Sequence, residues 1–146
     1  MGRYLNQGTD SFEKSVNSEI YVDKTGLIKY TNRVMNTLQG YVCVSRPRRF
    51  GKSTAANMLT AYYCRGCDSR DIFSKFEISK SSDFETYRNK YNTISLNMQE
   101  FLSRSDNIEA LIARVQKLVL RDLKREYPDV DYFDDTDLVE SMQDIY

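Results

Sequence analysis

The sequence predicts an α/β fold with a few parallel strands and flanking helices, and three features indicate it. Residues 41–44 (YVCV) form a short β-branched and aromatic run of the kind found in buried strands. A loop that contains a glycine leads from this run directly into a helix-forming segment, residues 53–63. A second run with alternating apolar residues, 93–98, lies between two segments that also favour helix. Short strands that alternate with helices are typical of a parallel sheet.

The composition fits one domain with an ordinary core. The chain has 146 residues, 40% of them apolar, which suffices for one domain and is too few for two. Lysine plus arginine equals aspartate plus glutamate, at 21 each, so the net charge favours neither nucleic acid nor an anionic membrane as partner. The sequence has neither the long apolar run of a membrane span nor the apolar core of a signal peptide. We therefore expect a soluble, cytoplasmic protein.

The cysteines and the absence of histidine restrict the chemistry. Cys64 and Cys67 have the C-x-x-C spacing, but only Cys43 and no histidine could complete a zinc site. Redox pairs of this spacing are usually activated at a helix N-terminus, whereas these cysteines follow a predicted helix. We therefore expect neither a metal site nor a redox function from the pair. Without histidine, Ser-His and Cys-His nucleophilic chemistry is excluded.

The chain before the strand at 41–44 is predicted to hold two helices and one other short strand. Residues 1–19 are polar and without a clear period, with a short helix near 10–15. Residues 19–22 form a strand-like run. Asp23 then stands where a helix N-cap belongs, and the apolar spacing after it predicts a helix over about 24–37.

The chain after the loop is predicted to be mostly helical. Its elements are a helix at 53–63, a short helix at 83–90, the strand at 93–98, a long amphipathic helix at about 107–126 and a final helix from 138 onward. Arg65 and Gly66 should end the first of these, as a basic last turn followed by a glycine. Thr136 or Asp137 could cap the final helix.

The segment between the predicted strand at 41–44 and the helix after it has most of a phosphate-binding loop. Such a loop reads Gly, four residues, then Gly-Lys-Ser/Thr, and Gly51, Lys52 and Ser53 supply its closing part. Arg46 occupies the place of the first glycine, where an ordinary residue often costs about 1–2 kcal/mol. Pro47 fixes its own φ and pushes Arg46 toward an extended geometry, so the strand can leave stiffly without a glycine hinge.

Each loop residue has an expected role toward phosphate. Phe50, Gly51 and Lys52 would supply backbone N–H groups at the positive end of the helix. Lys52 would also reach the β- and γ-phosphates, and the Ser53 hydroxyl would ligate magnesium. Thr54 would touch the α-phosphate.

Arg46, Arg48 and Arg49 add positive charge to the same loop. Because the net charge is neutral and these residues are compactly placed, a nucleotide phosphate is a better ligand for them than nucleic acid. For Arg48 and Arg49, ion pairs with nearby carboxylates are an alternative that the sequence leaves open.

Four segments together resemble a known family. They are Tyr21-Val22-Asp23-Lys24-Thr25, the loop from Ser45 to Ser53 (SRPRRFGKS), Tyr62-Tyr63 and Ile94-Ser95-Leu96. In these residues the chain resembles the AAA-ATPase-like family of bacterial proteins, whose usual loop also looks like this version with arginine in place of the first glycine. The resemblance covers nearly the whole chain, and longer family members usually carry a C-terminal nuclease-like domain of the PD-(D/E)XK type.

The resemblance implies a P-loop (Walker A) fold that binds ATP with Mg²⁺. The nucleotide-binding residues that it implies are Arg46, Arg48, Arg49, Phe50, Gly51, Lys52, Ser53 and Thr54, with Ser53 on the metal ion. No catalytic residue is carried over.

The second acidic motif of such ATPases is missing. Family members have an apolar strand followed by Asp-Glu (Walker B), which orders magnesium and polarises water. Asp134 and Asp135 have no apolar strand before them, and we interpret their loop and Glu100 as solvated surface.

We therefore expect a partial P-loop NTPase fold, the N-terminal portion of a longer protein cut before the Walker B strand. Residues 1–19 would be a lead-in and about 20–146 the partial domain. The strand at 41–45 would lack its usual neighbours, so we expect low stability or a reduced sheet.

Two functions of different classes follow. The first is an ATP-binding module that hydrolyses ATP poorly. The alternative is a non-enzymatic interaction fragment, which completes its fold with the missing C-terminal remainder or with another subunit.

Overall fold

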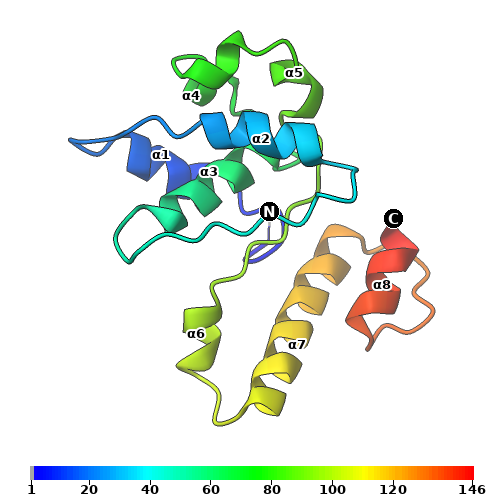
Figure 1. Cartoon of the computed structure of the whole chain (residues 1–146). Coiled ribbons are helices and arrows are strands. Elements are labelled where there is room, and N and C mark those ends of the chain that lie inside the picture. Colours follow the sequence, from blue (N-terminus) through cyan, green and yellow to red (C-terminus); the bar gives the residue numbers. More distant parts are fainter. Residues whose placement is uncertain (1) are drawn as a thin grey trace. The chain divides into compact units, whose positions relative to one another are not determined.

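The computed structural model describes residues 2–146, and its regular structure is helical (Figure 1). The elements are α1 (Asp10–Val16), α2 (Gly26–Val34), α3 (Lys52–Tyr63), α4 (Arg70–Phe73), the 3₁₀ helix η1 (Glu77–Lys80), α5 (Phe84–Tyr87), α6 (Met98–Leu102), α7 (Ile108–Glu126) and α8 (Leu138–Ile145). The chain divides into two compact units, one of residues 8–93 and one of residues 2–7 with 94–146. Among the helices of residues 2–146, none has both the length and the apolar content that a membrane crossing requires.

The predicted α/β fold with parallel strands is wrong, because residues 2–146 form no sheet. Residues 41–47 run as an irregular segment, drawn without an arrow in Figure 1, and Tyr41 is 98% exposed. A strand is stabilised by backbone pairing with a neighbour, and high β-propensity does not supply that neighbour. Within the described chain no segment pairs with residues 41–44, so they do not become a strand.

The other two predicted strands are wrong for the same reason. Residues 19–22 are irregular. Ile94 forms only an isolated antiparallel bridge with Leu5, supported by a hydrogen bond of 2.9 Å from the Ser95 N–H to the Tyr4 carbonyl. Only Ile94 of the alternating run at 93–98 therefore pairs with the N-terminal segment, and the pairing does not extend into a β-ladder.

The predicted helices are confirmed, some with shifted bounds. α1, α3, α7 and α8 begin and end within a few residues of the ranges expected from apolar spacing. α7 is capped by Asn107, whose side chain accepts from the Ala110 N–H, and α8 by Asp137, which accepts from Val139 and Glu140. These local caps explain why both starts are readable from sequence.

α2 is shorter than predicted, and Asp23 does not cap it. α2 starts at Gly26 instead of residue 24 and ends at Val34. One Asp23 oxygen accepts from the Thr25 N–H at 2.8 Å and the other from the Glu77 N–H at 3.0 Å. Asp23 therefore joins the turn before α2 to η1, a contact far away in sequence.

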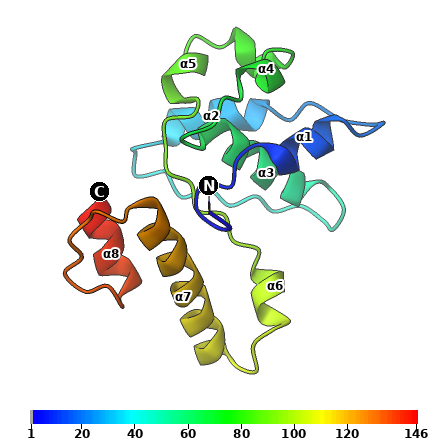
Figure 2. The ribbon, with the colours of Figure 1, turned by 180° about the vertical axis from the view of Figure 1, so that it is seen from behind.

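The unit of residues 8–93 has an aromatic core. Its fully buried apolar residues include Phe12, Ile28, Met58, Ala61, Tyr62, Phe73 and Ile78. The Phe12 and Phe73 rings stack with centroids 5.1 Å apart, and Tyr62 meets Phe73 edge-on at 5.4 Å. α1 packs along α3, as both Figure 1 and Figure 2 show, and this packing fixes α3 against the core.

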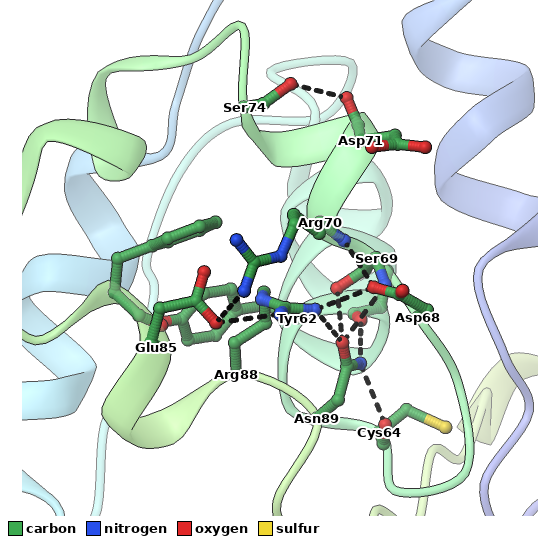
Figure 3. A network of polar contacts seen from close by, with 12 residues as sticks. Tyr62, Cys64, Asp68, Ser69, Arg70, Asp71, Ser74, Glu85, Arg88 and Asn89 are labelled. Atoms are coloured by element: carbon green, nitrogen blue, oxygen red, sulfur yellow. Dashed lines mark hydrogen bonds and ion pairs between the residues drawn. The ribbon is translucent and has the colours of Figure 1, made fainter.

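A polar network closes the far end of α3 (Figure 3). The Arg88 side chain donates to Asp68 at 2.9 Å and to Glu85 at 2.8 Å. The neighbouring Asn89 accepts from the N–H and hydroxyl of Ser69 and donates to the carbonyl of Cys64. The network thereby ties the segment after α5 to the turn that follows α3.

The second unit packs α6, α7 and α8 with the N-terminal residues. Tyr4, Leu5 and Phe101 lie in a core with apolar residues of α7. Buried Asp122 on α7 accepts from the Tyr4 N–H at 2.6 Å and more weakly from the Leu5 N–H at 3.4 Å. One α7 carboxylate therefore anchors the start of the chain.

Candidate functional site

The N-terminus of α3 presents backbone N–H groups that no acceptor among residues 2–146 reaches. Gly51 precedes the helix with φ +75° and provides no side-chain cap, and the first turn holds no acidic residue. Within residues 2–146, the N–H groups of Lys52, Ser53 and Thr54 have no acceptor. The partial positive charge of a helix start is therefore available to an anion.

Lys24 holds the loop from the side of α2. Its Nζ donates to the carbonyl of Phe50 at 2.9 Å. The ammonium lies so close to Gly51 that a Cβ built there would collide with the Lys24 Nζ. Glycine is therefore required at position 51 for two reasons: the backbone has a positive φ, and the Lys24 ammonium leaves no room for a Cβ.

The turn that carries Lys24 is itself fixed. Burial disfavours the charged form of Asp23. The hydrogen bonds donated by the backbone N–H groups of Glu77 and Thr25 outweigh this effect and lower the pKa of the carboxyl group. The buried Thr25 hydroxyl accepts from the Ile78 N–H at 3.2 Å. Lys24 thus reaches the loop from an anchored segment.

Four basic residues at the loop and the start of α3 are exposed and lack partners in the described part of the chain. Arg46, Arg48, Arg49 and Lys52 form no ion pair or hydrogen bond with any residue from 2 to 146. For Arg48 and Arg49, the carboxylate partners that the sequence left open are therefore not found in the described chain. Arg49 also has φ +68°, a conformation that costs an ordinary residue about 1–2 kcal/mol.

Two hollows flank the loop, and both are lined by Lys24, Phe50 and Gly51. One has a volume of about 430 Å³ and also includes Arg49 and Thr54. The other, of about 350 Å³, is completed by Val44, Arg46, Lys52 and residues of α2 and α3. No carboxylate of the described residues lines either hollow.

The structure thus brings most of the predicted site residues to these hollows. Of the eight residues named from sequence, Arg48 and Ser53 line neither hollow, although both lie in the same loop and helix start. Lys24 and Tyr21 were not predicted. The only sequence signal for them is the Tyr21–Thr25 stretch, to which the family resemblance assigns no role.

Tyr21 lines the larger hollow with a buried polar group. Its hydroxyl lies near the Lys24 backbone, but no residue from 2 to 146 meets it with full hydrogen-bond geometry. Burial, and to a lesser extent the charge of Asp23, raises the pKa of this phenol, so it stays protonated at neutral pH. A protonated hydroxyl can donate to a ligand oxygen.

Comparison with known proteins decides the family. A family model described as predicted AAA-ATPase matches residues 6–146. The chain belongs to the AAA-ATPase-like family. No curated protein and no solved structure matches it. Membership of the AAA-ATPase-like family is consistent with a nucleotide-binding module, and the α3 N-terminus is a place in this member suited to phosphate.

Proposed function

We propose that this chain binds ATP with Mg²⁺ and holds the phosphates at the N-terminus of α3. The observation that carries the proposal is the open helix start, where three N–H groups lack acceptors among the described residues and four basic side chains lack anionic partners. Such groups would normally be solvated, and an anion with several oxygens can satisfy them together. Family membership supports a nucleotide as that anion.

The proposed roles follow from position in the loop. Lys52 would contact the β- and γ-phosphates, and the Ser53 hydroxyl would hold Mg²⁺, which neutralises phosphate charge. Thr54 contacts the α-phosphate, and the N–H groups of Phe50 and Gly51 complete the cradle. Arg46, Arg48 and Arg49 add charge around it.

Lys24 is added to this set as a residue that positions the loop. Its ammonium group donates to the Phe50 carbonyl oxygen and so compensates the partial negative charge of that oxygen, which would otherwise repel bound phosphates. It also brings a positive charge to both hollows. Removing it should weaken binding without touching the residues named from the motif.

Binding, and not rapid hydrolysis, is the proposed activity of this chain. Phosphoryl transfer to water needs a group that orders magnesium and positions the attacking water. The hollows are lined by basic, apolar and hydroxyl side chains from the described residues. We expect turnover far below that of a typical ATPase, and rapid phosphate release by the purified chain would show that a catalytic carboxylate has been overlooked.

Calorimetric titration with Mg-ATP tests the proposal. Lys52→Ala should weaken binding about tenfold or more, because a hydrogen bond to a charged group contributes about 1.5–3 kcal/mol. Lys90→Ala is the matched control, since Lys90 is an exposed lysine of the same unit with no partner in the described chain. Equal affinities of wild type and Lys52→Ala would overturn the proposal.

The alternative function, a protein-interaction module, is favoured by one specific observation. Residues 41–44 expose Tyr41, Val42 and Val44, and their backbone groups form no hydrogen bond within residues 2–146. An extended segment with open N–H and C=O groups can pair with a strand from another segment or subunit. Partner binding that is lost in Val42→Pro and unaffected by Mg-ATP would favour this function over nucleotide binding.

A further inference from the structure

Cys64 and Cys67 bring their thiols into direct contact at the end of α3. The two Sγ atoms lie 2.9 Å apart. A disulfide bond needs about 2.05 Å, so a small rotation of the side chains would suffice to close one. The position of the pair after a predicted helix argued against a redox role, but that position does not show how near the two sulfur atoms come.

The backbone on the Cys64 side of the pair is fixed. The Cys64 carbonyl accepts from the Asn89 Nδ2 at 2.9 Å, as Figure 3 shows. The Arg65 N–H donates to the Tyr91 carbonyl at 2.7 Å and the Tyr91 N–H to the Tyr63 carbonyl at 3.0 Å. These bonds form the parallel bridge between Cys64 and Tyr91.

The Cys67 side is held through the same asparagine. Asn89 Oδ1 accepts from the N–H and the hydroxyl of Ser69, at 3.0 and 2.9 Å. Between the cysteines, Gly66 has φ +81° and open space around it, which lets the chain turn back on itself. One side chain therefore clamps both ends of the turn that carries the two thiols.

We propose that Cys64 and Cys67 form a redox-sensitive pair, which a peroxide closes to an intramolecular disulfide at the C-terminal end of α3. Cys67 is partly exposed and Cys64 is fully buried, so Cys67 meets the oxidant first. Cys43 is exposed elsewhere in the chain and takes no part.

The reaction balances as two thiols and hydrogen peroxide giving one disulfide and two waters. The Cys67 thiolate attacks one peroxide oxygen, the O–O bond breaks, and the departing hydroxide takes up a proton as water. The Cys64 sulfur then attacks the Cys67 sulfur of the sulfenic acid and expels hydroxide. That hydroxide takes the Cys64 proton, so no further oxidant is needed.

The environment of the pair favours a disulfide that forms slowly and is reduced slowly, unlike that of a thiol–disulfide exchange catalyst. Burial, with the Cys64 hydrogen bond next, raises the pKa of the Cys67 thiol to about 12, so little thiolate is present at neutral pH. A disulfide is easily reduced when its reduced form is stabilised as a thiolate. Here the Cys67 thiolate is disfavoured, so the reduced form has no such stabilisation. We therefore expect slow formation and slow reduction.

Intact-mass measurement on the Cys43→Ser chain tests the proposal. After treatment with hydrogen peroxide, the chain should lose the mass of two hydrogen atoms, and peptide mapping should link Cys64 to Cys67. Further replacement of Cys64 or Cys67 by serine should abolish that loss. If both thiols instead remain alkylatable, or are converted to sulfinic acid without linkage, the proposal is overturned.

A glutathione redox buffer separates the effect of the fold from that of sequence proximity. The folded Cys43→Ser chain should be oxidised with an equilibrium constant about tenfold or more above that of the same chain unfolded in urea, because the fold holds the sulfurs together. An equal or smaller constant for the folded chain would contradict the proposed role of the native geometry.

Discussion

At the scale of single residues, Gly51 is constrained both by its positive φ and by the nearby Lys24 ammonium. Gly66 shares only the positive φ, so comparing the two glycines separates these constraints. Both glycines have positive φ, +75° and +81°. Only Gly51 also has the Lys24 ammonium against it, whereas a Cβ at Gly66 would meet nothing within 4 Å.

Gly51→Ala and Gly66→Ala should therefore differ in function more than in stability. Each should lower the free energy of unfolding by about 1–2 kcal/mol through backbone strain, measurable in urea. Only Gly51→Ala displaces Lys24, so only it should weaken Mg-ATP binding, by about tenfold. Equal effects of both variants on ATP affinity would show that the loop is not the binding site.

Buried Tyr62 makes the stability sensitive to alkaline pH. Its hydroxyl donates to the Phe84 carbonyl at 2.8 Å, and burial, as the largest effect, raises its pKa to about 12. The folded pKa lies above the ordinary value near 10, so this contribution is fully present below pH ~10 and is lost as pH rises toward ~12. Urea unfolding at mildly and strongly alkaline pH should show a larger loss for wild type than for Tyr62→Phe. A loss of equal size in both would mean that other groups govern alkaline unfolding.

Lys24 shows what residue-level patterns cannot reveal. The motif names residues that follow one another along the loop, because their spacing carries the signal. Lys24 acts on Phe50 from another segment, and only the fold determines that their atoms meet. The family resemblance marked Tyr21–Thr25 without giving the stretch a role.

At the scale of elements, one buried carboxylate of α7 holds the N-terminal segment against this helix. Asp122 accepts two backbone N–H groups from the N-terminal segment and is only 2% exposed. Asp122→Ala should cost about 1–3 kcal/mol, because it leaves buried donors without an acceptor. Exposed Asp129 has no partner in the described chain, and Asp129→Ala serves as control in the same urea titration. A loss below ~0.5 kcal/mol for Asp122→Ala would show that water replaces the carboxylate.

The long helices could be predicted from the sequence, whereas the strands could not. α7 and α8 carry their apolar period and their caps, Asn107 and Asp137, within their own residues. The run at 41–44 has equally clear β-propensity, but its outcome depends on a partner elsewhere in the chain. The short elements α4, η1 and α6 span too few residues to show a period, so they were not predicted.

At the scale of the whole molecule, the structure has two cores and no sheet among residues 2–146. In place of the predicted parallel strands, aromatic residues pack around α3 in one unit and apolar residues pack around α7 in the other. The predicted domain bounds, a lead-in at 1–19 and a domain over about 20–146, remain a prediction.

Hydrogen exchange can check the absence of the central strand. Amides of residues 41–44 have no acceptor within the described chain and should exchange within seconds, as unprotected amides do. Amides in the middle of α3, around buried Met58, should exchange far more slowly. Strong protection at 41–44 in the isolated chain would indicate strand pairing that this structure lacks.

The most direct test of the proposed ATP site is a titration with Mg-ATP followed by amide resonances in NMR. The N–H groups of Lys52, Ser53 and Thr54 have no acceptor in residues 2–146, so phosphate oxygens bound there would shift these signals strongly. We expect the largest changes at these three amides and at Gly51, with a midpoint at about tenfold or more higher Mg-ATP concentration in Lys52→Ala and at an unchanged concentration in Lys90→Ala. Saturable binding that leaves these amides unmoved, or no binding at all, would show that the site lies elsewhere.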